Sequence, residues 1–233
     1  MKKLWIAFAG FLLLASCVNN QRETNVNMEE KQKTVLNLSE FENIKLLAPD
    51  TENPVPLMKA LENRRTSREF SDQELYLEDL SNVLWAAYGV NRPDGKRTAP
   101  SAMAVYPIDV YAVLSNGIYF YDAPNNELRA IVAGDYRRIT SGQEFAFHAP
   151  LNILYVVDLG KYEERFSSVP ETRLINLAIS DASHSSQNVY LCCAAFDMKT
   201  VIRGGGMNEP ELLKLLNLDE AKHRIPLAQT VGY

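Results

Sequence analysis

Three arginines and two hydroxyl residues lie within five consecutive positions: Arg64, Arg65, Thr66, Ser67 and Arg68. A guanidinium presents a planar fork of N–H donors that matches the oxygens of a phosphate, and the hydroxyls add donors for phosphate or polyol oxygens. This spacing therefore suits a phosphorylated ligand. The same residues would also suit the solvated end of a helix, where cations offset the negative pole of the helix dipole.

A second group suited to ligand binding is the glycine triplet Gly204, Gly205 and Gly206, which follows the apolar residues Val201 and Ile202. Glycine carries no side chain, so its backbone can approach a flat ring closely. The alternative is a plain turn between a strand and the next helix.

Hydrophobic periodicity predicts the elements that must position these groups. Helical spacing predicts one helix over residues 54–63, which delivers the arginines at its end, and a second over residues 75–87. Alternation around Asn116 and Gly117 predicts a β-hairpin over residues 108–121. The remaining expectations are a strand or loop at 122–129, a short helix at 130–136, a strand at 151–157, a long helix at 170–197, a strand at 201–203, a helix at 209–216 and a final strand at 225–233. Residues 189–196 of the long helix are apolar on every face, which predicts burial all round.

Composition excludes several classes of function. The chain has 233 residues and a formal net charge of −5, and this acidic balance does not suit general nucleic-acid binding. Neither the Gly-x-x-x-x-Gly-Lys-Ser/Thr loop nor the Gly-x-Gly-x-x-Gly turn occurs, so nucleotide sites of these two kinds are not supported. The three histidines have no metal-ligand spacing with each other or with the cysteines, so no metal site is expected. The adjacent Cys192 and Cys193 lie in an apolar helical pattern, which predicts burial as small hydrophobic residues.

The first residues follow the layout of an export signal. Lys2 and Lys3 precede an apolar run over residues 4–14 that is too short to cross a bilayer comfortably. The following residues, Leu14-Ala15-Ser16-Cys17, resemble a bacterial lipobox, whose cysteine is diacylated. We therefore expect an exported bacterial lipoprotein that is held at a membrane through Cys17. An ordinary signal peptide or a membrane anchor is the alternative.

The rest of the chain divides into two parts. Residues 18–50 are polar and mixed in charge, so they are expected to form a flexible tether, with local docking at Leu36 and residues 44–47. Residues 51–233 have the length and the aliphatic content of one domain.

Four segments resemble the signatures of the FMN-dependent nitroreductase superfamily, and they occur in the family's order. They are the arginine segment at 63–70, the loop at 97–107, the helical segment at 181–188 and the glycine-ended strand at 201–206. The Tyr106-Pro107 ending of the loop is similar to the azoline-oxidase branch, the SagB-type dehydrogenases. That branch has a glycine where this chain has Met103, and a loop that requires a positive φ there would be strained by methionine.

The resemblance implies an α+β sandwich, in which a mostly antiparallel sheet is flanked by helices, and an intertwined homodimer with two FMN sites at its interface. It also implies that the loop at Ser101 reaches the flavin of the other subunit. The residues it implies for cofactor binding are Arg64, Arg65, Thr66, Arg68, Pro100, Ser101, Ala102, Gln143, Gly204 and Gly205. Arg64 is expected to hold the phosphate, Arg68 to stabilise the charge of reduced flavin near N1 and O2, and Gln143 to bond the pyrimidine edge.

The implied activity is two-step electron transfer through flavin N5, from a donor to a small-molecule acceptor that the sequence does not identify. No catalytic residue is assigned. Lys161 and Tyr162 resemble a proton-transfer pair of the azoline-oxidase branch, but Gly160 interrupts that motif. His184 matches a family position that equally suits a core or interface histidine. A non-catalytic tethered module that binds flavin or peptide is the alternative function.

Overall fold

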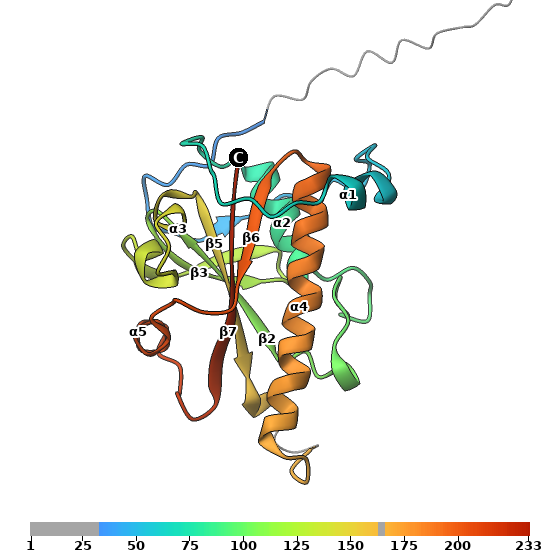
Figure 1. The fold of residues 1–233 in the computed structure, drawn as a ribbon, viewed down its shortest axis with the longest axis vertical. Coiled ribbons are helices and arrows are strands. Elements are labelled where there is room, and N and C mark those ends of the chain that lie inside the picture. Colours follow the sequence, from blue (N-terminus) through green and yellow to red (C-terminus); the bar gives the residue numbers. More distant parts are fainter. Residues whose placement is uncertain (1–32, 163–165) are drawn as a thin grey trace, which may run out of the picture. The chain divides into compact units, whose positions relative to one another are not determined.

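Within residues 33–162 and 166–233, which the computed structural model describes, seven strands form one sheet in the order β1-β4-β3-β2-β5-β7-β6 (Figure 1). Every strand pair is antiparallel. The strands are β1 (Ile44–Lys45), β2 (Ile108–Leu114), β3 (Gly117–Asp122), β4 (Glu127–Ala133), β5 (Leu151–Asp158), β6 (Lys199–Arg203) and β7 (His223–Gly232). The expected hairpin is β2–β3. The expected apolar strand is β5, which lies inside the sheet between β2 and β7.

Two long helices cover one face of the sheet, α2 (Leu77–Tyr88) and α4 (Glu171–Ala195), and α1 (Leu57–Asn63) packs against α4 (Figure 1). Their core residues pack against alternate residues of the strands, because successive strand side chains point to opposite faces. This core includes Leu80, Leu84, Ala178, Ala182, Val189, Val110, Ala112, Ile153 and Tyr155. Helix α4 begins directly after Pro170, whose fixed φ suits a helix start.

The opposite face carries smaller elements. Helix α5 (Glu209–Leu215) buries Leu212 and Leu213 against the other set of strand side chains, which includes Tyr111, Val113, Leu154, Val156 and Ala228. The remaining short helices are η1 (Ala102–Ala104), η2 (Arg137–Thr140), α3 (Phe145–His148) and η3 (Leu159–Tyr162). The expected α+β sandwich with an antiparallel sheet is therefore confirmed.

The short helix expected at 130–136 is wrong, because residues 130–133 belong to β4. Ala130, Ile131 and Val132 are consecutive apolar residues, and such a run does not distinguish a helix from a strand. Pairing with β3 decides the outcome: Tyr119 lies opposite Ala130, and Ile118 lies opposite Val132.

Residues 33–50, which the composition assigned to the tether, pack on the rest of the unit Lys33–Tyr233. Leu36 and Leu46 are buried, and the backbone N–H of Leu36 donates to the carbonyl of Leu75. Buried apolar side chains and backbone hydrogen bonds thus order residues 33–50, although their polar composition favoured a flexible tether. The expected signal, the lipidated Cys17 and the tether up to residue 32 lie outside the described residues.

The buried Asp79 of α2 joins both ends of this unit. Its carboxylate accepts two hydrogen bonds of 2.8 Å from the ammonium of Lys33 and one of 2.5 Å from the hydroxyl of Tyr233. The Asp79 side chain has no exposed surface, so these partners replace the water it would otherwise bind. We call this cluster the Asp79 clasp.

No helix in the described part of the chain is long and apolar enough to cross a membrane. Among the same residues, no group of His, Cys, Asp and Glu side chains could hold a metal ion.

Candidate functional site

The arginine segment, residues 64–68, follows the end of α1 and lies against the outer edge of β6. The backbone N–H of Ser67 donates to the carbonyl of Thr200 at 3.1 Å. Strand β6 is the last strand of the sheet, so the carbonyl of Thr200 is free to accept this bond. The sheet edge therefore fixes the course of the segment.

Tyr190 of α4 links this segment to the strand. Its hydroxyl accepts from the backbone N–H of Ile202 at 3.1 Å and lies 3.1 Å from the hydroxyl of Thr66. The guanidinium of Arg64 lies over its ring at 5.3 Å from the centroid. One side chain thus holds Thr66 and Arg64 at a set position relative to β6. The sequence offered no signal for Tyr190 beyond its place in an apolar helix.

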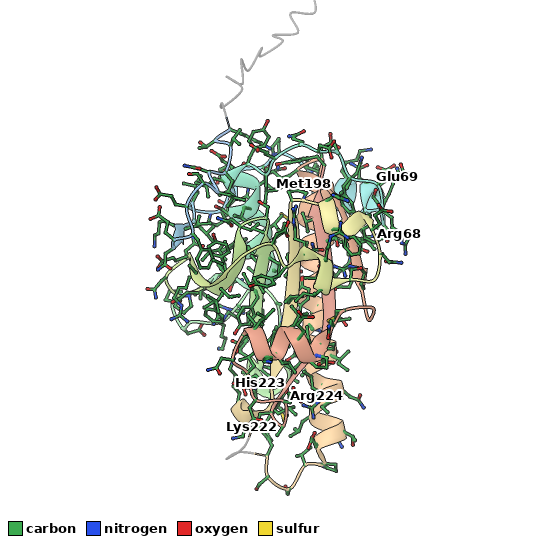
Figure 2. All side chains as sticks on the ribbon, turned by 90° about the vertical axis from the view of Figure 1, so that its left-hand side faces the viewer. Arg68, Glu69, Met198, Lys222, His223 and Arg224 are labelled. Carbon is green, nitrogen blue, oxygen red and sulfur yellow. The ribbon has the colours of Figure 1, made fainter. Side chains whose placement is uncertain are left out.

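The three arginines have no ion-pair partner among the described residues. Arg65 and Arg68 are exposed, and Arg64 is half-buried; Figure 2 shows Arg68 and Glu69 at the upper right of that view. A cavity of about 520 Å³ lies against the segment and is lined by Asn63, Arg65, Thr66, Ser67, Tyr190, Cys193, Ala194, Asp197, Met198, Lys199 and Thr200. The three guanidiniums are therefore unpaired in the described structure, and the cavity lining beside them also carries Asp197 and Lys199.

The glycine triplet and the loop that carries Gln143 are in contact. A Cβ placed on Gly206, whose φ is +80°, would lie 3.2 Å from the backbone nitrogen of Gly142, so only glycine fits there without strain. Gly204 and Gly205 are exposed, and nothing lies within 3.9 Å of a Cβ on either. Their backbone is open to a ligand. Gln143 is also exposed.

Phe70 connects the arginine segment to this loop. Its ring lies 5.9 Å from that of Phe145, at the start of α3 and two residues beyond Gln143. The structure therefore brings together three of the predicted groups: the arginine segment, Gln143 and the glycine triplet.

The loop with Pro100, Ser101 and Ala102 lies elsewhere in the same chain. The hydroxyl of Ser101 donates to the buried carboxylate of Asp181 on α4 at 2.7 Å, and the backbone N–H of Ala102 donates to it at 3.0 Å. Asp181 and Tyr190 are nine residues apart on α4, which corresponds to about 14 Å along the helix. Within one chain, the loop is therefore separated from the arginine segment.

The same loop has a positive φ at Met103, the position where the azoline-oxidase branch carries a glycine. Met103 has a φ of 56°, and Ala104 and Tyr106 have φ values of 54° and 55°. These left-handed conformations favour glycine. The backbone N–H of Tyr106 donates to the hydroxyl of Ser101 at 2.8 Å, so the bond between Ser101 and Asp181 also holds the loop in this shape.

The remaining candidates lie apart from the arginine segment. Lys161 forms an ion pair of 2.8 Å with Asp109. Tyr162 is buried, its hydroxyl has no hydrogen-bond partner among the described residues, and burial together with the charge of Asp181 raises its pKa to about 12. His184 is exposed on α4. Nothing in this arrangement assigns a proton-transfer role to any of them.

Arg203, at the end of β6, is a buried residue that sequence reasoning missed. Its guanidinium donates to the carbonyl of Thr140, to the side-chain oxygen of Asn152 at 2.8 Å and to the hydroxyl of Thr230 at 3.0 Å. An arginine in an apolar strand directly before three glycines is unusual. This unusual position was the signal in the sequence that could have marked Arg203 as a candidate.

Comparison with known proteins gives a consistent result. The profile described as Nitroreductase family matches residues 61–233. A provisionally assigned nitroreductase from Methanocaldococcus jannaschii is 29% identical over 182 residues, which cover 74% of this chain and 89% of the relative. The crystal structure of a provisionally assigned nitroreductase from Ralstonia eutropha JMP134 is similar with a TM-score of 0.75 and 37% identity, over 86% of this chain and 92% of that one. A further one from Desulfovibrio desulfuricans, in complex with FMN, shares the fold with a TM-score of 0.54 and 21% identity, over 76% of this chain and 86% of that one.

Proposed function

Because the chain belongs to the nitroreductase family, we propose that it is an FMN-dependent oxidoreductase that passes electrons to a small-molecule acceptor. One observation carries the proposal. Three guanidiniums without ion-pair partners among the described residues and an open glycine backbone lie at the same edge of the sheet. Unpaired cations suit a phosphate, and open backbone suits a flat ring.

The residues of this edge fit FMN. Arg64, Arg65 and Thr66 would hold its phosphate, since they offer charged and hydroxyl donors in one extended segment. Gly204 and Gly205 would face its ring, because a side chain would otherwise fill that space. When bound, FMN supplies reversible two-electron transfer at N5. The Desulfovibrio desulfuricans relative, solved in complex with FMN, supports this choice of cofactor.

Two further residues would tune the site. The exposed Arg68, two positions before Phe70, would bring a positive charge to the flavin and stabilise the negative charge that reduction leaves near N1 and O2. Gln143 would bond the pyrimidine edge through its side-chain amide. Its loop contacts the glycine triplet at Gly206, which supports that placement.

The proposed active form is a homodimer. Asp181 and Tyr190, which hold the loop at Ser101 and the arginine segment, are about 14 Å apart along α4. One chain therefore does not complete the predicted set, and a second copy could supply the loop. The region around α1 supports this arrangement: Leu57, Met58 and Leu61 are 63%, 74% and 43% exposed. They adjoin an apolar groove of about 360 Å³ lined by residues that include Val55, Trp85, Leu191, Cys192, Ala195 and Phe196.

The same groove accounts for the incomplete burial of α4 within one chain. Residues 189–196 were expected to be covered all round, yet within one chain only Val189, Tyr190 and Cys193 are buried. A second copy would cover the half-buried side. Desolvation by its apolar neighbours raises the pKa of the half-buried Cys192 thiol to about 12, which keeps the thiol protonated and unreactive at neutral pH.

The proposed location is the exported side of a bacterial membrane, with the chain held by a lipid on Cys17. The lipobox-like residues 14–17 support this proposal. In the producing bacterium, Cys17→Ala should move the protein out of the membrane fraction or leave its precursor uncleaved. Normal processing of the variant would disprove the assignment.

The alternative is a tethered module that binds flavin or peptide without turnover, and Met103, which replaces the glycine of the azoline-oxidase branch, would favour it if the loop needed that glycine for its shape. The loop adopts a positive φ at Met103 despite the missing glycine, so this substitution does not by itself argue against an active site.

The deciding experiment is an absorbance spectrum of the purified full-length protein, followed by anaerobic reduction and reoxidation with a panel of nitro and quinone acceptors. We expect a flavin spectrum, bleaching on reduction, and faster reoxidation with at least one acceptor than with buffer. A protein that binds FMN but does not accelerate any reoxidation would favour the alternative. A protein that binds no FMN would contradict the proposal.

A further inference from the structure

Arg203 is buried among neutral groups. Only 6% of the residue is exposed, and its three partners are oxygens of Thr140, Asn152 and Thr230. None of the described residues forms an ion pair with it. The Nε of Arg203 is buried and has no hydrogen-bond partner in the described structure.

This guanidinium remains charged at neutral pH. Burial alone lowers its pKa to about 10, and no nearby carboxylate contributes to that shift. Burying a charge without an opposite charge is costly, so isolated buried cations are uncommon in proteins. A neutral side chain would hold the sheet together at lower cost. The charge therefore calls for an explanation beyond packing.

The position of Arg203 supplies one. Its own backbone continues directly into Gly204 and Gly205, and its side chain bonds to the carbonyl of Thr140, three residues before Gln143. Asn152 extends the network by donating to the carbonyl of Ala146 at 2.8 Å, in α3. One side chain thus braces both segments that border the open glycine backbone.

We infer that Arg203 is a positioning residue of the flavin site, which fixes the Gln143 loop against the glycine triplet and supplies a buried positive charge that favours reduced over oxidised flavin. This inference rests on the proposed function. A charge in a low-dielectric interior is screened less than the exposed charge of Arg68, so it acts over a longer distance. Reduction adds negative charge to the flavin, and the cation stabilises that product.

The test compares four variants of the full-length protein. Arg203→Met and Arg203→Gln remove the charge, and Gln keeps amide donors for the oxygens of the network. Arg203→Lys keeps the charge with a different shape. Thr230→Val keeps the charge but removes one oxygen partner, so it controls for disturbance of the network. For each variant, FMN affinity, midpoint potential and thermal unfolding are measured.

We expect both neutral variants to lower the midpoint potential, through a loss of the preference for reduced flavin of roughly tenfold, which equals about 30 mV for a two-electron couple. Arg203→Lys should restore most of the potential. Thr230→Val should lower the unfolding temperature and leave the potential unchanged. If Arg203→Met fails to fold, Arg203→Gln provides the comparison.

Two results would overturn the inference separately from the proposed function. A folded, flavin-loaded neutral variant with the wild-type potential would show that Arg203 is a structural residue only. An equal fall in potential for Thr230→Val would show that network geometry, and not charge, sets the potential. A wild-type protein that binds no FMN would instead refute the proposed function, and the inference with it.

Discussion

Arg64 and Arg68 belong to one cluster, but they lie in different surroundings. Arg64 is half-buried and stacks on the ring of Tyr190, whereas Arg68 is exposed and precedes the ring of Phe70 by two positions. The first arrangement holds a guanidinium at a fixed position. The second leaves it free to follow a ligand. We therefore expect the two arginines to affect different properties of the site.

Arg64→Ala should weaken FMN binding by about tenfold to a hundredfold, since a charge-assisted hydrogen bond contributes about 1.5 to 3 kcal/mol. Arg68→Ala should chiefly lower the midpoint potential of the bound flavin. Fluorescence titration and spectroelectrochemistry measure the two quantities, with circular dichroism as the control for folding. If neither changes in folded protein, the cluster is only a charged helix end.

Met103 holds a left-handed backbone conformation that costs a side-chain-bearing residue about 1 to 2 kcal/mol. Glycine removes that cost but adds about 0.5 to 1 kcal/mol of chain entropy to the unfolded state. Met103→Gly should therefore stabilise the fold by about 0.5 to 1 kcal/mol in urea unfolding. Met103→Ala, which keeps the Cβ, is the matched control and should not stabilise. A destabilised glycine variant would mean that the methionine side chain makes contacts that outweigh the strain.

At the level of the elements, the sequence alone predicts a helix or strand correctly where one hydrophobic periodicity dominates the segment. The apolar run of β5, the alternation of β2 and the start of α4 at Pro170 were all predictable, because each depends on neighbouring residues. Strand β4 was not, since pairing with β3 decides between helix and strand there.

The site likewise has features that the local sequence predicts and features that depend on the fold. The residue types of the arginine segment and the glycine triplet could be read from the sequence. Their partners could not, because Ser101 and Asp181, or Thr66 and Tyr190, are separated by 80 and 124 positions. Only the folded chain shows that Tyr190 and Arg203 support the site.

The hydroxyl of Tyr190 forms a hydrogen bond between helix α4 and the edge strand β6. Tyr190→Phe should keep the ring under Arg64 but remove the acceptor of the Ile202 N–H. We expect a loss of about 1 kcal/mol of stability and a fall in FMN affinity of a few fold. Tyr88→Phe is the control, because the hydroxyl of Tyr88 is buried without a hydrogen-bond partner in the described structure. Equal effects of the two changes would remove the proposed link between α4 and the arginine segment.

At the level of the whole molecule, the exposed apolar residues of α1 predict self-association. Light scattering should report a dimer at micromolar concentration, and Leu57→Glu combined with Met58→Glu should give a monomer with weakened FMN binding. Ile131→Glu is the matched control, since Ile131 is 42% exposed on β4. A wild-type monomer that is stable and loaded with flavin would contradict the homodimer.

The Asp79 clasp has a consequence for the kinetics of folding. The bond between Tyr233 and Asp79 joins residues 154 positions apart, and that between Lys33 and Asp79 joins residues 46 apart. Contacts of long sequence separation close slowly, because loop-closure entropy opposes them until the rest of the chain is ordered. We therefore expect the clasp to form after the rate-limiting step. Asp79→Asn should then speed unfolding by roughly tenfold or more while leaving the folding rate nearly unchanged. Stopped-flow mixing in denaturant measures both rates, with Lys59→Gln, which removes only an exposed ion pair, as the control. A slower folding rate for Asp79→Asn would instead place the two ends of the packed chain together in the folding nucleus.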